Sequence, residues 1–166
     1  MHDVTLKRCL QALAARPEAV VLDWRSSLGA DEVIVYCHKS DVSKIVGRGG
    51  KTLNALVRIG RVLVAPNGFC IPEVREHEAD SQDERPYTYD EAVALLREVC
   101  SAAFRKPVTV RTEEENLWMV TVDGEVNRRT AAGTASAIID LFEAIGLTIG
   151  LRGSNRLRIQ INSRAE

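Results

Sequence analysis

The sequence predicts an α+β protein of two small units, each a three-stranded sheet with helices packed on one face. Three observations predict this class. The spacing of apolar residues gives the same order of helix, strand, strand, helix and strand in each half of the chain. An acidic and polar stretch without periodicity, residues 76–86, reads as a linker between them. The length of 166 residues allows two small domains, which we place at residues 1–75 and 87–166.

The first half begins with a predicted amphipathic helix over residues 4–15, with Asp3 as its N-cap. Short apolar and β-branched runs predict strands over residues 20–25, 33–36 and 69–74. Aromatic residues on strands more often lie in a core than on a binding surface. We therefore expect the first half to bury two of its rings, those of Trp24 and Tyr36.

A helix–loop–helix segment follows the second of these strands. Ser40 is predicted to cap a short helix that contains Ile45 and Val46. The run Gly47-Arg48-Gly49-Gly50, called here the glycine loop, ends that helix. Apolar residues at helical spacing then predict a second helix that extends to about Ala65.

The second half begins at a capping box, in which Thr88 and Glu91 satisfy each other's backbone amides at the start of a helix. Two strands follow at residues 107–112 and 117–122, and alternation of apolar and polar residues marks a third at 157–161. The helix between them is predicted to end at Gly146. Two aromatic residues of this half, Trp118 and Phe142, fall on apolar periods and are predicted to lie in the core.

The net charge of −1 hides a strong segregation of charge. Residues 38–61 carry six basic residues and one acid, whereas residues 71–91 carry eight acids and two basic residues. Such adjacent blocks suggest two surfaces with different partners, although two solvated faces explain them as well. One hypothesis is that the acidic block masks the basic one.

Several function classes find no support in the sequence. The four cysteines lie far apart without a C-x-x-C pair, so we expect reduced thiols, a cytoplasmic location and no metal site. No apolar run approaches the roughly 18 residues of a membrane span, and we expect no membrane association. The three histidines have no convincing catalytic partner, so we expect neither an enzyme nor a cofactor.

The glycine loop carries the strongest functional signal. Its glycines allow a sugar–phosphate backbone to approach the protein backbone closely, and the helix that begins after Gly50 attracts phosphate through its free amides. Arg48 and Lys51 place positive charge beside the same phosphates. The apolar side chains of Ile45, Val46 and Leu53 are predicted to form a floor for bases.

Residues 41–56, with a Gly-x-x-Gly loop between two helices after a strand, resemble the KH domain. The order of elements fits the bacterial type II arrangement, and residues 1–74 resemble the small single-KH RNA-binding proteins of bacteria almost end to end. The resemblance implies a non-enzymatic bacterial post-transcriptional regulator or RNA chaperone whose loop clamps about four nucleotides of single-stranded RNA. It implies RNA contacts at Lys44, Ile45, Val46, Gly47, Arg48, Gly49, Gly50, Lys51, Leu53 and Arg58. Only one charge lies inside the loop, so affinity depends strongly on the flanking cations.

Three alternatives remain. A phosphate-binding P-loop is suggested by Gly49-Gly50-Lys51-Thr52, but Ile45 stands where that motif needs its first glycine. The glycines also fit a plain tight turn, which does not explain the flanking cations. Finally, the fold also fits a protein-interaction or dimerisation module with weak or no RNA binding, whose partner is another protein or a second copy of the chain.

The second half resembles a degenerate copy of the same domain. Thr130-Ala131-Ala132-Gly133 occupies the expected place of the loop, without its first glycine and without a cation. We therefore expect an impaired clamp and a structural role. Arginines on this half suggest a second basic surface, although ordinary solvated arginines are the favoured explanation. The members of that surface are Arg128, Arg129, Arg156 and Arg158.

Overall fold

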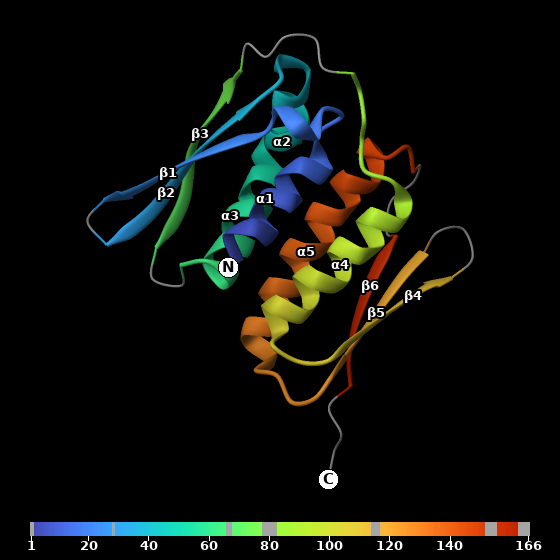
Figure 1. Ribbon diagram of the computed structural model, residues 1–166. Coiled ribbons are helices and arrows are strands. Elements are labelled where there is room, and N and C mark those ends of the chain that lie inside the picture. Colours follow the sequence, from blue (N-terminus) through green and yellow to red (C-terminus); the bar gives the residue numbers. More distant parts are fainter. Residues whose placement is uncertain are drawn as a thin grey trace.

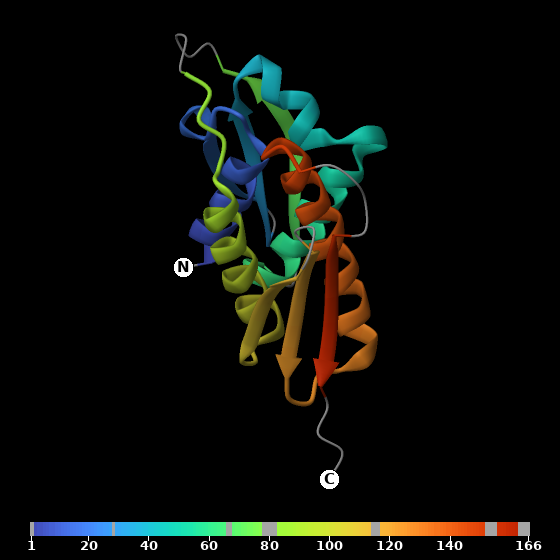
Figure 2. The same ribbon diagram turned by 90° about the vertical axis from the view of Figure 1, so that its right-hand side faces the viewer.

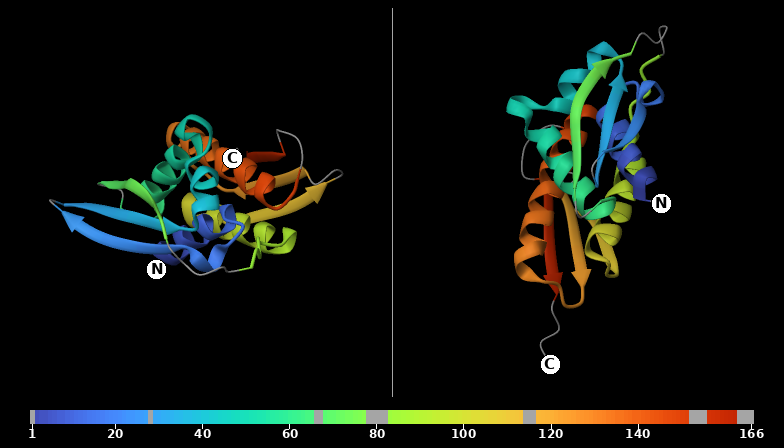
Figure 3. Two further views of the ribbon diagram at one scale, coloured as in Figure 1. Left: turned by 90° about the horizontal axis from the view of Figure 1, so that it is seen from above. Right: turned by 90° about the vertical axis from the view of Figure 1, so that its left-hand side faces the viewer.

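A computed structural model describes residues 2–27, 29–65, 68–77, 83–113, 117–151 and 156–162, and it confirms the α+β class. Two three-stranded sheets form the outer layers of the molecule. The helices lie between them, so that each sheet is covered by helices on its inner face only (Figures 1 and 3).

The first unit pairs β1 (Val21–Ser27), β2 (Ala30–Cys37) and β3 (Phe69–Glu76) in that order. β1 and β2 are antiparallel, as expected for a hairpin, and β2 and β3 are parallel. The parallel pairing requires a crossover, which the helical segment between β2 and β3 provides. In this crossover α3 (Lys51–Leu63) lies beside α1 (His2–Leu13) on the inner face of the sheet (Figure 1).

The second unit repeats this topology. After α4 (Tyr89–Phe104), β4 (Val108–Glu113) pairs antiparallel with β5 (Leu117–Asp123). The crossover helix α5 (Arg128–Thr148) then leads to β6 (Leu157–Asn162), which is parallel to β5 (Figure 2). The repeated order of elements read from the sequence is therefore confirmed in both halves.

Buried residues of the two units form one continuous core. α1 is buried both toward its own sheet and toward α4, where the Thr5 hydroxyl donates to Glu98 at 2.9 Å. Farther along, the Thr148 hydroxyl of α5 donates to the Leu13 carbonyl at 3.0 Å. The helical layers thus join the units, and the division into domains at 1–75 and 87–166 stays a prediction.

Local details correct some expectations. α1 begins at His2, so Asp3 lies in its first turn rather than at its N-cap. Trp24 is 36% exposed on the edge strand β1, where its ring lies tilted against that of Phe69 with 6.0 Å between the centroids. Tyr36 is only partly buried. By contrast, the expected core positions of Trp118 and Phe142 are confirmed, since both are fully buried and their rings meet edge to face.

The predicted start of the linker at residue 76 is one residue too early, because Glu76 still belongs to β3. Its residues 78–82 lie outside the described part of the chain. Where the description resumes, the Arg85 amide donates to the Ala15 carbonyl at 2.8 Å, and Glu84 pairs with Arg16 at 3.5 Å. This end of the linker is therefore held against the C-terminal end of α1.

α5 qualifies the membrane argument. Its 21 residues are long and apolar enough in composition to span a bilayer, contrary to our reading of the sequence. One such helix is weak evidence, because a core helix has the same composition. Here Ile138, Leu141 and Phe142 of α5 pack in the core.

The four cysteines are free thiols. Three of them, Cys9, Cys37 and Cys100, are buried, and burial raises the pKa of each. The pKa of Cys37 rises to about 11, with a smaller contribution from the Asp41 carboxylate. These thiols are therefore protonated near neutral pH and behave as apolar core residues.

Candidate nucleic-acid interface

The glycine loop joins the short helix α2 (Val42–Val46) to α3. All three of its glycines have positive φ, with values of 76° at Gly47, 63° at Gly49 and 77° at Gly50. The Gly47 amide still donates to the Ser43 carbonyl of α2, and the Gly50 amide donates back to Gly47 at 3.2 Å. The loop is thus a tight, internally hydrogen-bonded turn, and residues other than glycine rarely adopt its backbone conformation.

The glycines serve two different purposes. At Gly47, with ψ at 170°, an added Cβ lies only 2.8 Å from the Thr52 amide nitrogen and collides with the Thr52 side chain. At Gly49 and Gly50, an added Cβ meets nothing within 4 Å. Gly47 is therefore required by the packing of the turn itself, whereas the backbone of the other two faces open space.

We expect Gly47→Ala to destabilise the protein far more than Gly49→Ala. Gly47 combines a backbone region that essentially only glycine occupies with a collision against backbone, for a loss of about 3 kcal/mol. Gly49→Ala loses only about 1 kcal/mol of stability, because its one cost is an alanine in the left-handed conformation. Urea denaturation followed by circular dichroism measures both, and equal losses would contradict this assignment.

A buried carboxylate fixes the position of the helix that precedes the loop. Asp41 is fully buried and accepts hydrogen bonds from the amides of Ala15 at 3.0 Å and Arg16 at 3.1 Å, just beyond α1. It precedes α2 directly, and so fixes the start of α2 to the end of α1. The predicted cap is corrected here: Ser40 lies in a short 3-10 turn, in which its amide donates to Nδ1 of His38.

The four cations predicted for the interface have different environments. Lys44 pairs with Asp41 at 3.3 Å, and Lys51 pairs with Asp140 of α5 at 3.4 Å. Arg58 donates to the carbonyl of Gly133 at 2.7 Å and so lies between the two units, two turns of α3 away from the loop. Arg48 is exposed and forms no ion pair with any described residue. Its charge is therefore available to a ligand at the loop.

The predicted apolar floor is only partly available. Ile45 is fully buried in the core, where it anchors α2. Val46 and Leu53 are partly exposed, one on each side of the loop. Thr52, between loop and core, is buried and forms the wall against which Gly47 packs.

The N-terminus of α3 completes the site. Gly50 is its N-cap, and no side chain caps it. The first amides of a helix have no partner within the helix, and the helix dipole adds positive potential there. The Lys51 amide at this end donates to the Arg48 carbonyl, and the N-cap Gly50 has no side chain to bond the amides that follow. The exposed Arg48 stands in the same loop beside open glycine backbone, an arrangement that suits a phosphate group.

Residues 124–148 of the second unit, all of them described, contain no counterpart of this loop. Thr130-Ala131-Ala132-Gly133, predicted as a degenerate loop, lies inside α5. The Asn127 side chain accepts from the amides of Arg129 and Thr130, so the helix begins before the predicted loop. Four residues separate β5 from α5, which leaves no room for a short helix and a turn.

The predicted second basic surface is divided. Arg128 and Arg129 are exposed at the start of α5, whereas Arg156 and the exposed Arg158 belong to the start of β6. The end of β6 lies beside the start of α5, because Asn162 pairs with Asp123, so Arg158 and Arg156 lie about 13 and about 20 Å back along the strand. The structure does not bring the four arginines together.

Two carboxylates of the site escaped sequence reasoning, Asp41 and Asp140. The bonds of Asp41 join residues 25 and 26 positions apart, and Lys51 and Asp140 come from different units. No local pattern reveals such pairs. The acids of residues 71–91 that the structure describes form no ion pair with the basic block 38–61, so nothing in the described part supports masking.

Comparisons with known proteins add little. No family model matches the chain, and no curated protein matches it. A solved structure titled "Crystal structure of APE1850" aligns with 95% of this chain and 96% of its own at 13% sequence identity, with a TM-score of 0.29. That similarity is too low to carry an argument about fold or function.

Proposed function

We propose that this protein binds single-stranded RNA without catalysing a reaction, and that the glycine loop takes the phosphate backbone. One observation carries the proposal: Arg48, exposed and without an ion pair among the described residues, lies beside two glycines whose backbone faces open space, at the start of α3. The resemblance of residues 41–56 to the KH domain supports the same reading, as does the crossover topology around the loop.

The resemblance further suggests a bacterial, cytoplasmic post-transcriptional regulator or RNA chaperone. The chemistry of the loop selects phosphate and not particular bases, because neither an aromatic ring nor an amide side chain lies within residues 47–50. Sequence preference then depends on partly exposed Val46 and Leu53, which offer shape and no hydrogen bonds. We therefore expect weak sequence selectivity.

A protein-interaction or dimerisation module is the second candidate. The observation that favours it is the pairing of Lys44 and Lys51 with carboxylates, which lowers the charge available to RNA. In this reading the glycine loop no longer binds RNA, and the helical layers provide the surface for protein contacts. Light scattering after size-exclusion chromatography detects the self-association that this candidate requires.

The salt dependence of RNA binding tests the proposal. For a labelled single-stranded RNA of about eight nucleotides, twice the length a KH loop clamps, we expect saturable binding in fluorescence anisotropy. If Arg48 and Lys51 each neutralise one phosphate, the logarithmic salt slope is about −1.4, so affinity falls about sevenfold between roughly 50 and 200 mM salt. ATP and GTP serve as competitors, since their binding at the loop would favour a nucleotide-dependent protein instead.

Two outcomes contradict the proposal. Absence of RNA binding together with tight self-association supports the interaction module. Binding that does not respond to salt shows that phosphate contacts do not drive it, which removes the glycine loop from the explanation.

A further inference from the structure

The glycine-loop helix and the crossover helix of the second unit form a seam. Lys51 pairs with Asp140, and Arg58 bonds to the Gly133 carbonyl, so residue numbers rise along α3 as they fall along α5. The two helices are therefore antiparallel. The N-terminal turn of α5, with Arg129 and Thr130, consequently faces the C-terminal half of α3.

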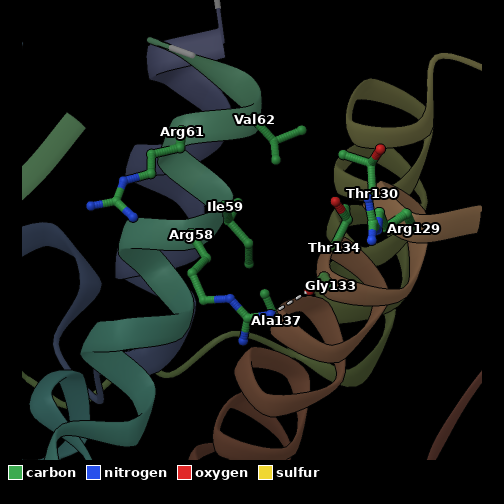
Figure 4. A pocket seen from close by; sticks show the side chains of 9 residues that line it. All are labelled: Arg58, Ile59, Arg61, Val62, Arg129, Thr130, Gly133, Thr134 and Ala137. Carbon is green, nitrogen blue, oxygen red and sulfur yellow. Dashed lines mark hydrogen bonds between the residues drawn. The ribbon is translucent and has the colours of Figure 1, made fainter. Parts of the chain in front are cut away.

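A groove of about 280 Å³ opens along this seam. Figure 4 shows α3 as one wall and α5 as the other, with Arg58 reaching across toward Gly133 and with Arg129 beside Thr134 on the facing wall. Ile59, Val62 and Ala137 give it apolar parts.

The charged side chains that line the groove are all basic, and the acid Glu125 lines the adjoining groove that shares Thr130 and Thr134 with it. The lining of the groove itself contains the arginines Arg58, Arg61 and Arg129 and no acid. Arg58 and Arg61 donate to backbone carbonyls, and neither donates to a carboxylate among the described residues. The acceptor of Arg61 is the Phe69 carbonyl at 3.4 Å, and its guanidinium points away from the groove (Figure 4). The first turn of α5 has no acid either, and the dipole of that helix adds positive potential. By contrast, the groove beside Arg8 and Tyr87 contains Glu91 and Glu98, and Arg8 is paired there.

We infer that this groove binds a phosphate group, with Arg58 and Arg129 holding it from opposite walls. Its volume lies just below the range of pockets that enclose whole small molecules, which favours one charged group over an entire ligand. Two threonine hydroxyls, from Thr130 and Thr134, line the same space and add hydrogen-bond donors. Arg58, which the sequence placed with the loop, belongs to this second site.

The source of the phosphate follows from position. Arg58 lies seven residues after Lys51, so it shares a face of α3 with Lys51 about 10 Å farther along the helix. If one phosphate of an RNA strand is held at the glycine loop and the strand runs along α3, another phosphate farther along the strand lies at the groove. This assignment rests on the proposed function. A free phosphorylated small molecule offers the same chemistry, and the experiment separates the two sources.

The test compares Arg58→Gln with Arg129→Gln, which removes both charges and keeps hydrogen-bonding side chains, with a matched control. The control, Arg97→Gln with Arg128→Gln, removes two exposed charges outside the groove, one of them next to Arg129. The probes are pyrophosphate and single-stranded RNAs of about four and about twelve nucleotides, the shorter matching the length a KH loop clamps. Calorimetry measures pyrophosphate binding, anisotropy measures RNA binding, and circular dichroism verifies folding.

We expect the groove variant to weaken the longer RNA about tenfold relative to the control and to flatten its salt slope by about 0.7, the value for one neutralised phosphate, while leaving the shorter RNA unchanged. Equal affinities of groove variant and control for the longer RNA, with no pyrophosphate bound by either, would overturn the groove while leaving the proposed function standing. Loss of pyrophosphate binding in the groove variant alone, in a protein that binds no RNA, supports the groove as a site for a free phosphate and overturns the proposed function.

Discussion

Replacing Arg48 and Gly49 with aspartate together is expected to lower RNA affinity by at least a hundredfold. The change moves three charge units, from one cation to two anions, to the place where phosphate is proposed to lie. Each unit contributes about 1 kcal/mol at 4 Å even in water, so the three sum to about 3 kcal/mol, and every 1.4 kcal/mol is tenfold.

The variant is expected to remain folded. Arg48 is exposed and unpaired among the described residues, and Gly49 faces open space. Gly49 has a left-handed conformation, with φ of 63° and ψ of 20°, which aspartate tolerates better than most residues. Anisotropy with a short labelled RNA measures the loss, and circular dichroism verifies the fold.

A charge-matched control separates the loop from the field of the whole protein. Arg97→Asp with Lys7→Gln changes the net charge by the same three units at exposed positions of α4 and α1. We expect this control to lose less than threefold, because charges farther than a Debye length of about 8 Å are screened. Equal losses in variant and control would show a diffuse electrostatic attraction and no loop clamp.

Local patterns predicted the elements of this fold well because their causes are local. The capping box is an example: the Glu91 amide donates to Thr88 at 3.2 Å, and the Thr88 amide donates back to Glu91 at 3.1 Å. Both partners lie within four residues, so the sequence alone contains the whole interaction. The glycine loop is similar, since its bonds join residues 43 to 50.

Other predictions failed because a nearby helix cap was overlooked or because distant segments decide the outcome. Gly133 looked like a loop glycine, but Asn127 starts the helix earlier, and α5 keeps this glycine in its interior at a typical cost of about 1 kcal/mol relative to alanine. Its carbonyl accepts the Arg58 bond from the other unit, a contact across 75 residues that no local pattern contains. Trp24 failed for a related reason, because the sequence does not reveal that β1 lies at the edge of its sheet.

The same long-range contacts lead us to expect that neither half folds by itself. Peptides of residues 1–77 and 83–166 are each predicted to lack a cooperative thermal transition. In the first peptide, α1 and α3 lose the α4 and α5 layer that covers their second face. Fully burying a large apolar side chain contributes about 1.5–3 kcal/mol, so exposing a few of them removes a stability of typically 5–15 kcal/mol.

Particular contacts of α1 show how complete the loss is. Cys9 is buried, and its pKa is raised first by burial and then by Glu98 of α4, so it faces the second unit. Thr5 bonds to the same carboxylate, and the Leu13 carbonyl accepts from Thr148. Removal of the second unit therefore exposes to water a face of α1 that is buried in the whole protein.

Mixing the two peptides in equal amounts is expected to restore the helical circular dichroism signal and a single cooperative transition, because the interface then reforms between chains. A first half that assembles as a homodimer agrees with this argument, since a second copy then covers the exposed helices, and light scattering identifies it. A first half that unfolds cooperatively as a monomer contradicts it. That result would establish residues 1–75 as an independent domain. The shared core would then be an interface between two units that each fold alone, and neither unit would need it to fold.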